Sequence, residues 1–449
     1  MAAKPAKIFR DPLYNYVSID RDRDAWLLNL LDTPEMQRLR RIHQLGVSYF
    51  TYPGADHNRL AHSLGVVHLM QQSLLHLERI HDGEEIRLAR AALLAAALLH
   101  DVGHGPFSHL FEPCLGIDHE IWSKNIVMDP TTQVHKILKG VDGYLPDKVA
   151  DLIDKENNEH PPWQKALLSS QLDMDRLDYL RRDSLFTGAG YGHFDFYRIL
   201  NSFDVLNGDL VKGDLVWSEK SKLAIEEYVF SRYYMYQNVY LHKTTRGFEK
   251  MLEAMWRRAK ELQNNGTDTN LVPALREFWT SGDQATVQQY LKIEEFTVLQ
   301  QIQQWTSHSD QPLADLAQRF LARNRFAAID PPQPDNELVG TYTRWEAALH
   351  KTLEQHGYKC METHCLKDQV KAKYHQPYFP EKENDQQSAR NAIRIRTDQD
   401  GKPKEISTIM ERLRPVTTRG SADQVRYYVP MDARDSARTL KAQWSPQRP

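Results

Sequence analysis

The sequence predicts a mostly α-helical protein, a helical bundle that carries a small β-hairpin and is followed by a smaller C-terminal α/β region. Apolar residues between positions 24 and 262 recur mainly with the 3.6-residue period of amphipathic helices. Strand-like alternation is confined to a few short segments. With 41% hydrophobic and 10% aromatic residues, the 449-residue chain has enough apolar material for a buried core.

The elements follow one another in a clear order. Phe203–Trp217 alternates apolar and polar residues around glycine-containing pairs, which predicts the hairpin. Asn264–Asn270 is polar and predicts a loop, and a second helical stretch is predicted over about Leu271–Ala327. This stretch should stop at Ile329–Asn336, because the three prolines there break a helix.

Two strand-like segments, Ala392–Arg396 and Val425–Val429, predict a small mixed α/β region near the end of the chain. We therefore expect three units. The main domain covers residues 1–265, a helical extension covers 266–336 and the α/β region covers 337–449.

Charge, hydropathy and cysteine content exclude several classes of protein. The 57 Lys and Arg residues nearly balance 60 Asp and Glu, and no aromatic-basic strand motif for nucleic acid is present. The longest apolar run, Ala91–Leu99, is nine residues, about half of the roughly 20 needed to cross a bilayer. Met1–Arg10 lacks the apolar core of a signal peptide, and Cys114, Cys360 and Cys365 cannot form a disulfide framework. We expect a cytoplasmic protein without membrane or nucleic-acid partners.

A group of histidines and aspartates carries the most specific chemical signal. His100-Asp101 ends the apolar helix predicted at Leu88–Leu99, where Gly and Pro residues follow at once. His62 heads a helical pattern upstream, and Asp175 lies in a helical pattern downstream. Two imidazoles and two carboxylates on three helices suit one divalent ion such as Mn²⁺, Fe²⁺, Co²⁺ or Zn²⁺.

These residues also have structural interpretations. An isolated His-Asp pair is more often a helix cap with a hydrogen-bonded core histidine. Asp175, Tyr179 and Asp183 form an i, i+4, i+8 stripe, which by itself is typical of a solvated acidic face. The segment Cys360–Cys365, with His364 inside it, is a competing metal candidate that lacks the usual second Cys/His pair.

Four extended segments give the chain a family resemblance. They are DTPEMQRLRRIHQLG (Asp32–Gly46), YPGADHNRLAHSLG (Tyr52–Gly65), LLHDVGHGPFSHLFE (Leu98–Glu112) and LDMDRLDYLRRDS (Leu172–Ser184). The H…HD…D pattern inside them resembles the signature of HD-domain metal phosphohydrolases. The segments are similar in particular to the deoxynucleoside triphosphate triphosphohydrolases, which include bacterial dGTPases and vertebrate enzymes with a preceding SAM domain. The resemblance is dense over Lys7–Lys243, and we expect no SAM module here.

The resemblance implies an HD-type catalytic domain over residues 1–265. The implied metal ligands are His62, His100, Asp101 and Asp175. His104 would contact the α-phosphate, His109 would protonate the leaving 5′-oxygen of the deoxyribose, and His119 would support this acid. An imidazole that titrates near pH 6.5 is suited to general acid catalysis at neutral pH. A plain surface position remains open for His119.

The resemblance also implies how a dNTP is held. The implied substrate residues are Gln44, Leu45, Arg59, Arg176, Tyr179, Asp183, Arg232, Tyr236 and Tyr240. The arginines match phosphate-contacting positions, although ion pairs at a helix surface are the common role of arginine. Gln44 and Asp183 match partners of the 3′-hydroxyl, and the ring of Tyr179 matches one that leaves no room for a ribose 2′-hydroxyl.

A third set matches nucleotide-activator positions at subunit junctions. These residues are Lys7, Asp32, Gln37, Arg40, Asp195, Arg198, His242 and Lys243. An activator bound between subunits implies a homo-oligomer, either a tetramer or a hexamer. For the segment around Gln37 and Arg40, a solvated helix stabilised by i, i+4 pairs is the alternative.

The expected function is hydrolysis of dNTPs to a deoxynucleoside and inorganic triphosphate, with dGTP preferred or acting as activator. One divalent metal per active site, with Mg²⁺ among the candidates and also able to accompany the nucleotide, is the expected cofactor. The alternatives are an HD-type nucleotidase, an alarmone phosphohydrolase and a non-catalytic assembly that senses dNTPs.

Overall fold

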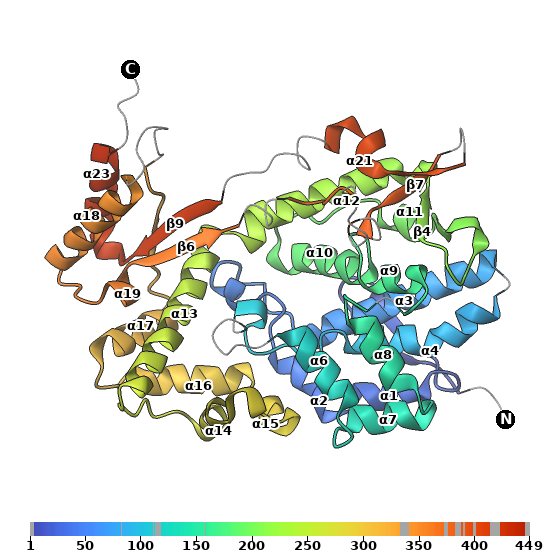
Figure 1. The fold of residues 1–449 in the computed structure, drawn as a ribbon, viewed down its shortest axis with the longest axis horizontal. Coiled ribbons are helices and arrows are strands. Elements are labelled where there is room, and N and C mark those ends of the chain that lie inside the picture. The colour runs from blue at the N-terminus through green and yellow to red at the C-terminus, as the bar shows by residue number, and fades with distance from the viewer. Residues whose placement is uncertain are drawn as a thin grey trace.

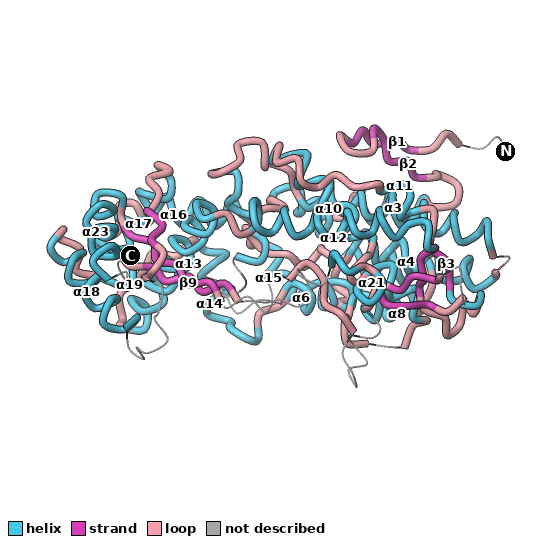
Figure 2. Tube along the Cα trace, turned by 90° about the horizontal axis from the view of Figure 1, so that it is seen from above, coloured by secondary structure: helices cyan, strands magenta, loops and turns pink. Residues whose placement is uncertain are grey.

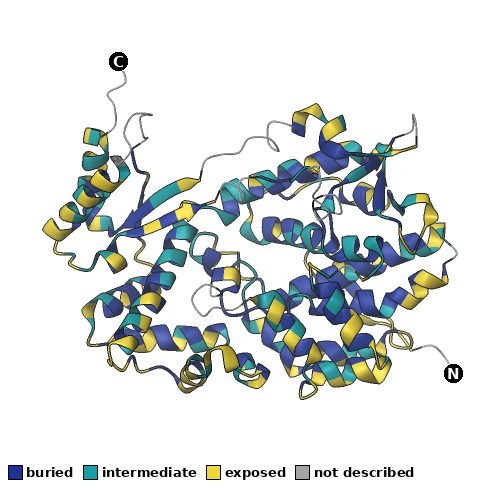
Figure 3. Cartoon of the chain, in the orientation of Figure 1, coloured by how far each residue is buried: buried dark blue, intermediate teal, exposed yellow. Residues whose placement is uncertain are grey.

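The structure, a computed structural model, describes residues 4–81, 83–110, 112, 118–157, 159–332, 341–371, 376–381, 388, 391–397, 401–413 and 423–444. The fold is mostly helical, as the sequence predicts, with small sheets at its edges (Figure 1). Peripheral helices carry exposed faces, whereas the inner helices are largely buried (Figure 3). No described helix has both the length and the hydrophobicity needed to span a bilayer.

A β-hairpin that the sequence analysis did not predict opens the chain. β1 (Lys7–Asp11) pairs antiparallel with β2 (Asn15–Ile19), and Figure 2 shows this hairpin projecting from the helices. The turn is fixed by the Asp11 carboxylate, which accepts hydrogen bonds from the backbone N–H groups of Leu13 and Tyr14. Asp11 and Tyr14 also contact the helix that carries Asp178 and Arg182, as described below.

The predicted main domain is a bundle of short and long helices. Its helices are α1 (Ala25–Leu31), α2 (Pro34–Arg38), α3 (Arg59–Ile80), α4 (Glu84–Leu99), α6 (His119–Met128), α7 (Gln133–Val141), α8 (Leu145–Ile153), α9 (Pro162–Leu168), α10 (Met174–Thr187), α11 (Phe196–Leu200) and α12 (Lys222–Met235). Helix α3 packs against both α4 and α10. The side chain of Asn58 caps α3 and that of Asp173 caps α10. These caps place His62 and Asp175 in the first turns of two adjacent helices.

The predicted hairpin is confirmed and forms part of a larger sheet. β3 (Phe203–Val205) pairs antiparallel with β4 (Leu215–Ser218). β7 (Arg394–Arg396) then pairs parallel with β4, and β8 (Pro403–Glu405) pairs antiparallel with β7. A strand from the end of the chain therefore completes a sheet of the main domain.

A long helix, α13 (Lys243–Asn264), leads into the second helical stretch. This stretch contains α14 (Pro273–Ser281), α15 (Val287–Leu291), α16 (Glu295–Trp305) and α17 (Gln311–Leu321). The helical prediction was wrong at its end: α17 stops at Leu321, and Ala327–Ile329 forms strand β5. Asn324 donates to the Arg319 carbonyl beyond the last turn, and Arg323 has φ of 54°, so the chain turns out of the helix before the prolines.

β5 (Ala327–Ile329) belongs to a second sheet with the order β5-β9-β6, in which β6 is Leu366–Val370 and β9 is Gln424–Val429. α18 (Thr341–Gln355), α19 (Met361–His364) and α23 (Arg434–Trp444) accompany this sheet, and α21 (Ile406–Ile409) follows β8. Strands were predicted at both 392–396 and 425–429, and both segments contain strands, but in two different sheets. The described parts of 337–449 are thus divided between the two sheets: β7 and β8 belong to the sheet of β3 and β4, whereas β6 and β9 belong to the sheet of β5.

Candidate functional site

Three helices bring four predicted ligands together. His62 lies in the first turn of α3, His100 caps the C-terminus of α4 with Asp101 next to it, and Asp175 begins α10. His62 Nε2 lies 3.0 Å from Asp175 Oδ1, and His100 Nε2 lies 3.6 Å from the same oxygen. Ligand atoms of His62, His100 and Asp175 all lie within 4.8 Å of one another. Asp101 faces the same point, 3.6 Å from His62 Nε2 and 3.5 Å from His100 Nε2.

The donor set suits a divalent cation. The Nε2 atoms of His62 and His100 are buried and make no directed hydrogen bond within the described part of the chain. A buried polar atom without a partner is costly, and a metal ion would satisfy both nitrogens at once. Two imidazole nitrogens with two carboxylates match the mixed N/O sets that bind divalent transition metals.

Charges around this cluster keep both carboxylates ionised. Burial alone would raise the pKa of Asp101, but Arg59 and His104 hold it well below its usual range. Burial would also raise the pKa of Asp175, and His100 and His62 hold it well below its usual range. An anionic pair of carboxylates is the state that a cation requires.

Behind His62 lies a buried network that the sequence analysis missed. Asp178 Oδ2 lies 2.7 Å from His62 Nδ1, and the Arg182 guanidinium donates to both oxygens of Asp178. Tyr14 of the N-terminal hairpin donates its hydroxyl to Asp178 Oδ1, and Arg182 donates to Asp11 Oδ2 at 2.9 Å. The signal for Asp178 was its place three residues after Asp175, on the inner side of the same helix.

A second histidine cluster, made of His104, His109, Glu112 and His119, lies beside the first. Ligand atoms of these four side chains all lie within 4.8 Å of one another. Glu112 Oε1 lies 3.1 Å from His109 Nδ1 and 2.6 Å from His119 Nδ1. Burial would raise the pKa of Glu112, but the two histidines hold it below its usual range. The three predicted catalytic histidines are therefore together, joined by a glutamate that was not predicted.

Arg59 and Ser108 connect the two clusters. Arg59 pairs through Nη1 with the Asp101 carboxylate and donates from Nε to Ser108 Oγ at 2.8 Å. His104 Nδ1 lies 3.2 Å from Asp101 Oδ1. The loop between them is tight, because Phe107 and Ser108 both have positive φ angles, 55° and 57°.

Helices beyond the predicted main domain hold this loop in place. Tyr290 of α15 donates its hydroxyl to the Gly103 carbonyl at 2.6 Å, and Glu295 of α16 accepts from the Phe107 N–H at 3.0 Å. Arg38 donates to the carbonyls of His104 and Ile293, both at 2.7 Å. The sequence analysis did not predict these contacts, which join residues between 66 and 255 positions apart.

A third group of predicted residues lies around Asp183. Tyr240 donates its hydroxyl to Asp183 Oδ2 at 2.7 Å, and His57 Nε2 lies 2.8 Å from Asp183 Oδ1. The ring centroid of Tyr240 lies 6.3 Å from that of Tyr179 and 5.0 Å from that of Tyr236. His57, which the sequence analysis missed, therefore contacts Oδ1 of this carboxylate. Tyr240 binds Oδ2, and the rings of Tyr179 and Tyr236 lie next to that of Tyr240.

The remaining predicted substrate residues are close to these groups or tied to the backbone. Gln44 has a buried Oε1 without a partner in the described residues, and Leu45 follows it half-buried. Arg176 donates to Asp173 Oδ2 at 2.6 Å and to the Ser170 carbonyl. Arg232 donates to the Pro377 carbonyl and lies over the Tyr236 ring, 5.4 Å from its centroid.

The predicted activator residues lie on exposed or half-buried ends of several elements. Arg40 donates to Gln37 Oε1 at 2.7 Å, while Lys7 and Asp32 are exposed. Asp195 caps α11 and lies 3.8 Å from Arg198 Nε. His242 caps α13, whose first residue is Lys243, and burial together with Lys243 lowers the pKa of His242. Among the described contacts, none joins these residues to the two histidine-containing clusters.

The competing cysteine segment does not assemble as a metal site among the described residues. His364 Nδ1 lies 3.0 Å from the Cys360 carbonyl and its Nε2 lies 3.1 Å from Asp315 Oδ2, so both ring nitrogens have other partners. Cys360 and Cys365 are free thiols, and burial raises the pKa of Cys365 to about 12. Cys114 lies outside the described residues.

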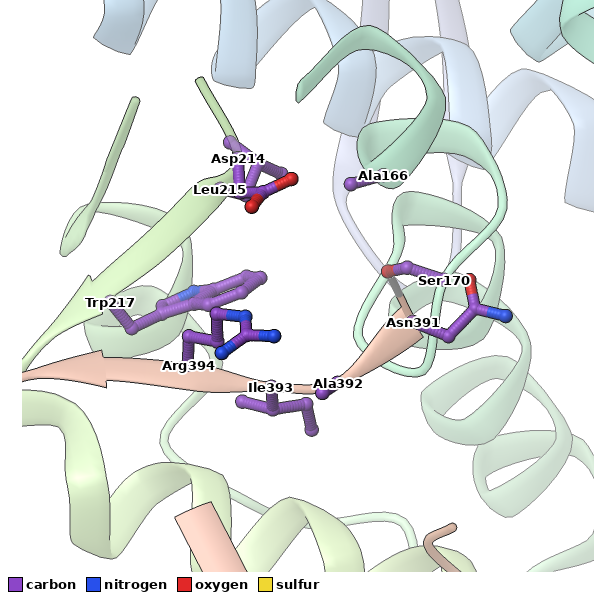
Figure 4. A pocket seen from close by; sticks show the side chains of 9 residues that line it. All are labelled: Ala166, Ser170, Asp214, Leu215, Trp217, Asn391, Ala392, Ile393 and Arg394. Carbon is purple, nitrogen blue, oxygen red and sulfur yellow. The ribbon is translucent and has the colours of Figure 1, made fainter. Parts of the chain in front are cut away.

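A small pocket lies elsewhere, between α9 and strands β4 and β7 (Figure 4). It is lined by Ala166, Ser170, Asp214, Leu215, Trp217, Asn391, Ala392, Ile393 and Arg394. None of these is a predicted site residue, and the lining holds no histidine. The lining of this pocket therefore shares no residue with the two histidine-containing clusters.

Comparisons with known proteins agree with this geometry. A family model described as the HD domain matches residues 59–183, which contain all four predicted metal ligands. The chain is 38% identical over 327 residues to the uncharacterised protein YwfO of Bacillus subtilis, covering 72% of each chain. It is similar along 94% of its length to a crystal structure of a phosphohydrolase from Bacteroides thetaiotaomicron, with 29% identity, a TM-score of 0.75 and 99% of that chain covered.

The fold and the histidine–aspartate cluster define an HD-domain metal-dependent phosphohydrolase. The chain belongs to the HD-domain phosphohydrolase family, in which YwfO is a relative of similar length. More distant similarity extends to the Dictyostelium discoideum homologue of deoxynucleoside triphosphate triphosphohydrolase SAMHD1, with 28% identity over 261 residues. That match covers 56% of this chain and 48% of the relative.

Proposed function

We propose that the protein hydrolyses dNTPs to a deoxynucleoside and inorganic triphosphate. The observation that carries the proposal is the contact between the two clusters, with His104 Nδ1 lying 3.2 Å from Asp101 Oδ1. A phosphate bound at His62, His100, Asp101 and Asp175 would therefore lie beside the second histidine cluster. The distant relatives named as dNTP triphosphohydrolases support the same substrate class.

The metal ligands would be His62, His100, Asp101 and Asp175. A divalent ion bound there supplies a Lewis acid for a phosphate oxygen and lowers the pKa of a bound water. Hydrolysis of phosphate esters is among the slowest uncatalysed reactions, so charge stabilisation and positioning must supply most of the rate. The native ion is one of Mn²⁺, Fe²⁺, Zn²⁺, Co²⁺ and Mg²⁺, and Mg²⁺ can also accompany the nucleotide.

The second histidine cluster would handle the leaving group. With Nδ1–H directed at Glu112, the doubly protonated ring of His109 would carry its second proton on Nε2 and would transfer that proton to the departing 5′-oxygen, which leaves a neutral imidazole. The His109 side chain is 67% exposed, so a leaving group can approach it from solvent. His119 shares Glu112 with His109 and holds this carboxylate in place, while the buried His104 would contact the α-phosphate.

The rest of the substrate would extend toward Asp183. Arg59, Arg176 and Arg232 supply positive charge for a triphosphate. Asp183, which is held by His57 and Tyr240, would accept a hydrogen bond from the 3′-hydroxyl. Gln44 would be the second partner of this hydroxyl. The remaining sugar and base contacts would come from Leu45, Tyr179, Tyr236 and Tyr240.

Assembly and activation belong to the same proposal. The activator residues would bind dGTP or another dNTP between subunits of a tetramer or hexamer. Light scattering with and without dGTP tests this part separately, and a monomer under both conditions would reject it.

The test of the main proposal is product analysis. Purified protein is incubated with each dNTP, singly and in pairs, with Mn²⁺ or Mg²⁺, and the phosphate products are separated by ion-exchange chromatography. We expect intact tripolyphosphate and deoxynucleoside. Release of orthophosphate or pyrophosphate instead would reject the proposal and favour an HD-type nucleotidase or alarmone hydrolase.

Matched variants connect the activity to the site. Asp175→Asn removes one proposed ligand and should lower turnover about 100-fold or more. Asp283→Asn makes the same chemical change at an exposed position and should leave turnover unchanged. A non-catalytic sensor would instead bind dNTPs without releasing any product.

A further inference from the structure

We propose that the second histidine cluster is itself a cation site, which binds a Zn²⁺-like ion and stops hydrolysis when it is occupied. His104, His109, Glu112 and His119 supply three imidazole nitrogens and one carboxylate. Cation binding here does not depend on which nucleotide is hydrolysed, whereas the inhibitory effect rests on the proposed function.

The distances in the cluster allow four-coordinate binding. Ligand atoms around a tetrahedral Zn²⁺ lie about 3.3 Å from one another, as metal–nitrogen bonds of about 2.0–2.1 Å require. The four ligand atoms of the cluster already lie within 4.8 Å of one another. The ring centroids of His104 and His119 are 3.9 Å apart, and that of His109 lies 5.0 Å from His104. Side-chain rotations that draw the atoms in by at most about 1.5 Å would complete the site.

His104 gives an independent indication of a ligand. Its side chain is 1% exposed, and neither ring nitrogen makes a directed hydrogen bond within the described part of the chain. Nδ1 lies 3.2 Å from Asp101 Oδ1, whereas Nε2 is buried without a partner among the described residues. Such burial is costly, so a group that binds Nε2 would be favoured. Its ring is packed against those of His109 and His119, so a cation in the cluster would lie within reach of one of its nitrogens.

The donor types select the kind of cation. Imidazole nitrogen suits Zn²⁺, Co²⁺ and similar ions, whereas Mg²⁺ prefers oxygen ligands in octahedral geometry. With three nitrogens and one carboxylate, the second histidine cluster should bind Zn²⁺ and discriminate against Mg²⁺. The first cluster contains two carboxylates and is less selective.

Binding of this cation and acid catalysis exclude each other. Glu112 now accepts hydrogen bonds from Nδ1 of both His109 and His119. A bound Zn²⁺ takes the place of these protons, which are released to solvent, and it occupies the side chains that would protonate the leaving group. The second equivalent of Zn²⁺ should therefore lower the rate that the first ion supports.

The experiment measures stoichiometry, with Zn²⁺ alone as the probe. Metal-free protein is dialysed against Zn²⁺, and bound zinc per chain is measured by elemental analysis. We expect two ions in the wild type, and one in Glu112→Gln or Asp175→Asn. The control Glu85→Gln changes an exposed glutamate on α4 and should keep two. Circular dichroism confirms that each variant is folded, and the exposed His109 provides a second variant, His109→Gln, if Glu112→Gln does not fold.

One zinc per chain in the wild type, or two in both Glu112→Gln and His109→Gln, would overturn the inference. The inhibitory role would be overturned if the protein binds two zinc ions but hydrolyses its substrate as fast with two equivalents bound as with one. Failure of the proposed function is distinguishable, because a protein that releases no triphosphate can still bind two zinc ions.

Discussion

Asp178 Oδ2 lies 2.7 Å from His62 Nδ1, on the opposite side of the imidazole ring from the Nε2 atom that faces Asp175. Asp178 is fully buried, and Arg182 donates to both of its oxygens. A carboxylate at this position fixes the orientation and tautomer of a metal-binding histidine and increases the basicity of its free nitrogen. The geometry around His62 is therefore set before any metal arrives.

Replacing Asp178 should weaken metal binding although Asp178 is not a ligand. Asp178→Asn keeps the shape but removes the charge, and we expect an affinity loss of about 10–100-fold, measured by isothermal titration with Mn²⁺. Asp283→Asn is the matched exposed control. This role would be contradicted if the Asp178→Asn protein unfolds in a cooperative thermal transition, and so is folded, and binds Mn²⁺ with the same affinity as the wild type.

Removing the metal should destabilise the protein through the same cluster. A ligand that binds only the folded state at 100 times its dissociation constant adds about 2.7 kcal/mol of stability. Saturating Mn²⁺ should therefore raise the melting temperature of the wild type, and a chelator should reverse the rise. Asp175→Asn should show little response to either. An equal rise in both proteins would place the stabilising ion elsewhere.

Tyr240 should contribute to recognition of the 3′-hydroxyl through Asp183. Tyr240→Phe keeps the ring and removes the hydrogen bond to Asp183 Oδ2, worth about 1 kcal/mol, so KM for a dNTP should rise about fivefold. A 2′,3′-dideoxynucleotide has no 3′-hydroxyl and provides the control. If the variant changes the KM of both substrates equally, Asp183 is not the 3′-hydroxyl partner.

Two helical glycines should respond in opposite directions to alanine. A Cβ at Gly65 would overlap the Asp178 carboxylate and lie 2.5 Å from Arg182 Nη2, so Gly65→Ala should destabilise the protein by about 1–3 kcal/mol. Gly140 in α7 has no neighbouring atom within 4 Å of such a Cβ, and Gly140→Ala should stabilise by about 0.5–1 kcal/mol. Thermal melting of both variants tests the pair, and a shift of the same sign would contradict it.

His43 should make stability depend on pH. Burial would lower its pKa, but Glu295 and Asp56 raise it to about 9, from about 6.5 in the unfolded chain. The protonated form is favoured by folding, so this contribution is fully present below about pH 6.5 and is lost as pH rises through about 9. After allowance for solvent screening, we expect about 1–2 kcal/mol.

The comparison with His43→Gln isolates this contribution. The difference between wild-type and variant unfolding midpoints in urea should be larger at pH 6.5 than at pH 9.5. If the difference between the two midpoints is constant across this pH range, His43 carries the same charge in the folded and the unfolded protein.

The sequence singled out the four proposed metal ligands because each lies beside a strong local signal. Asn58 and Asp173 are helix caps, and His62 and Asp175 follow them in the first turns of α3 and α10. His100-Asp101 follows the apolar C-terminal half of α4, and glycine and proline come directly after it. Position relative to a helix terminus is a local property, so it could be predicted. That the four side chains converge is a property of the packing of α3, α4 and α10.

Apart from Asp178, the residues that support the site could not be predicted, since nothing near them in the sequence marks their role. Tyr290 and Glu295 reach the Gly103–Phe107 loop from helices that we expected to form a separate extension. His57 and Glu112 resemble ordinary polar surface residues until Asp183 and two histidines are placed beside them. The N-terminal hairpin was missed because each of its strands is only five residues long, too short for a clear alternating pattern.

The sequence by itself determined the helical character, the kinds of donor atoms and the order in which they occur, because periodicity, capping and side-chain chemistry are local. Only the tertiary structure decided that Asp101 lies between two clusters, that Asp178 and Glu112 orient the histidines, and that a strand from residues 394–396 returns to the main domain. The physical reason is that burial and hydrogen-bond partnership depend on neighbours far away in the chain, which packing of the whole core brings together.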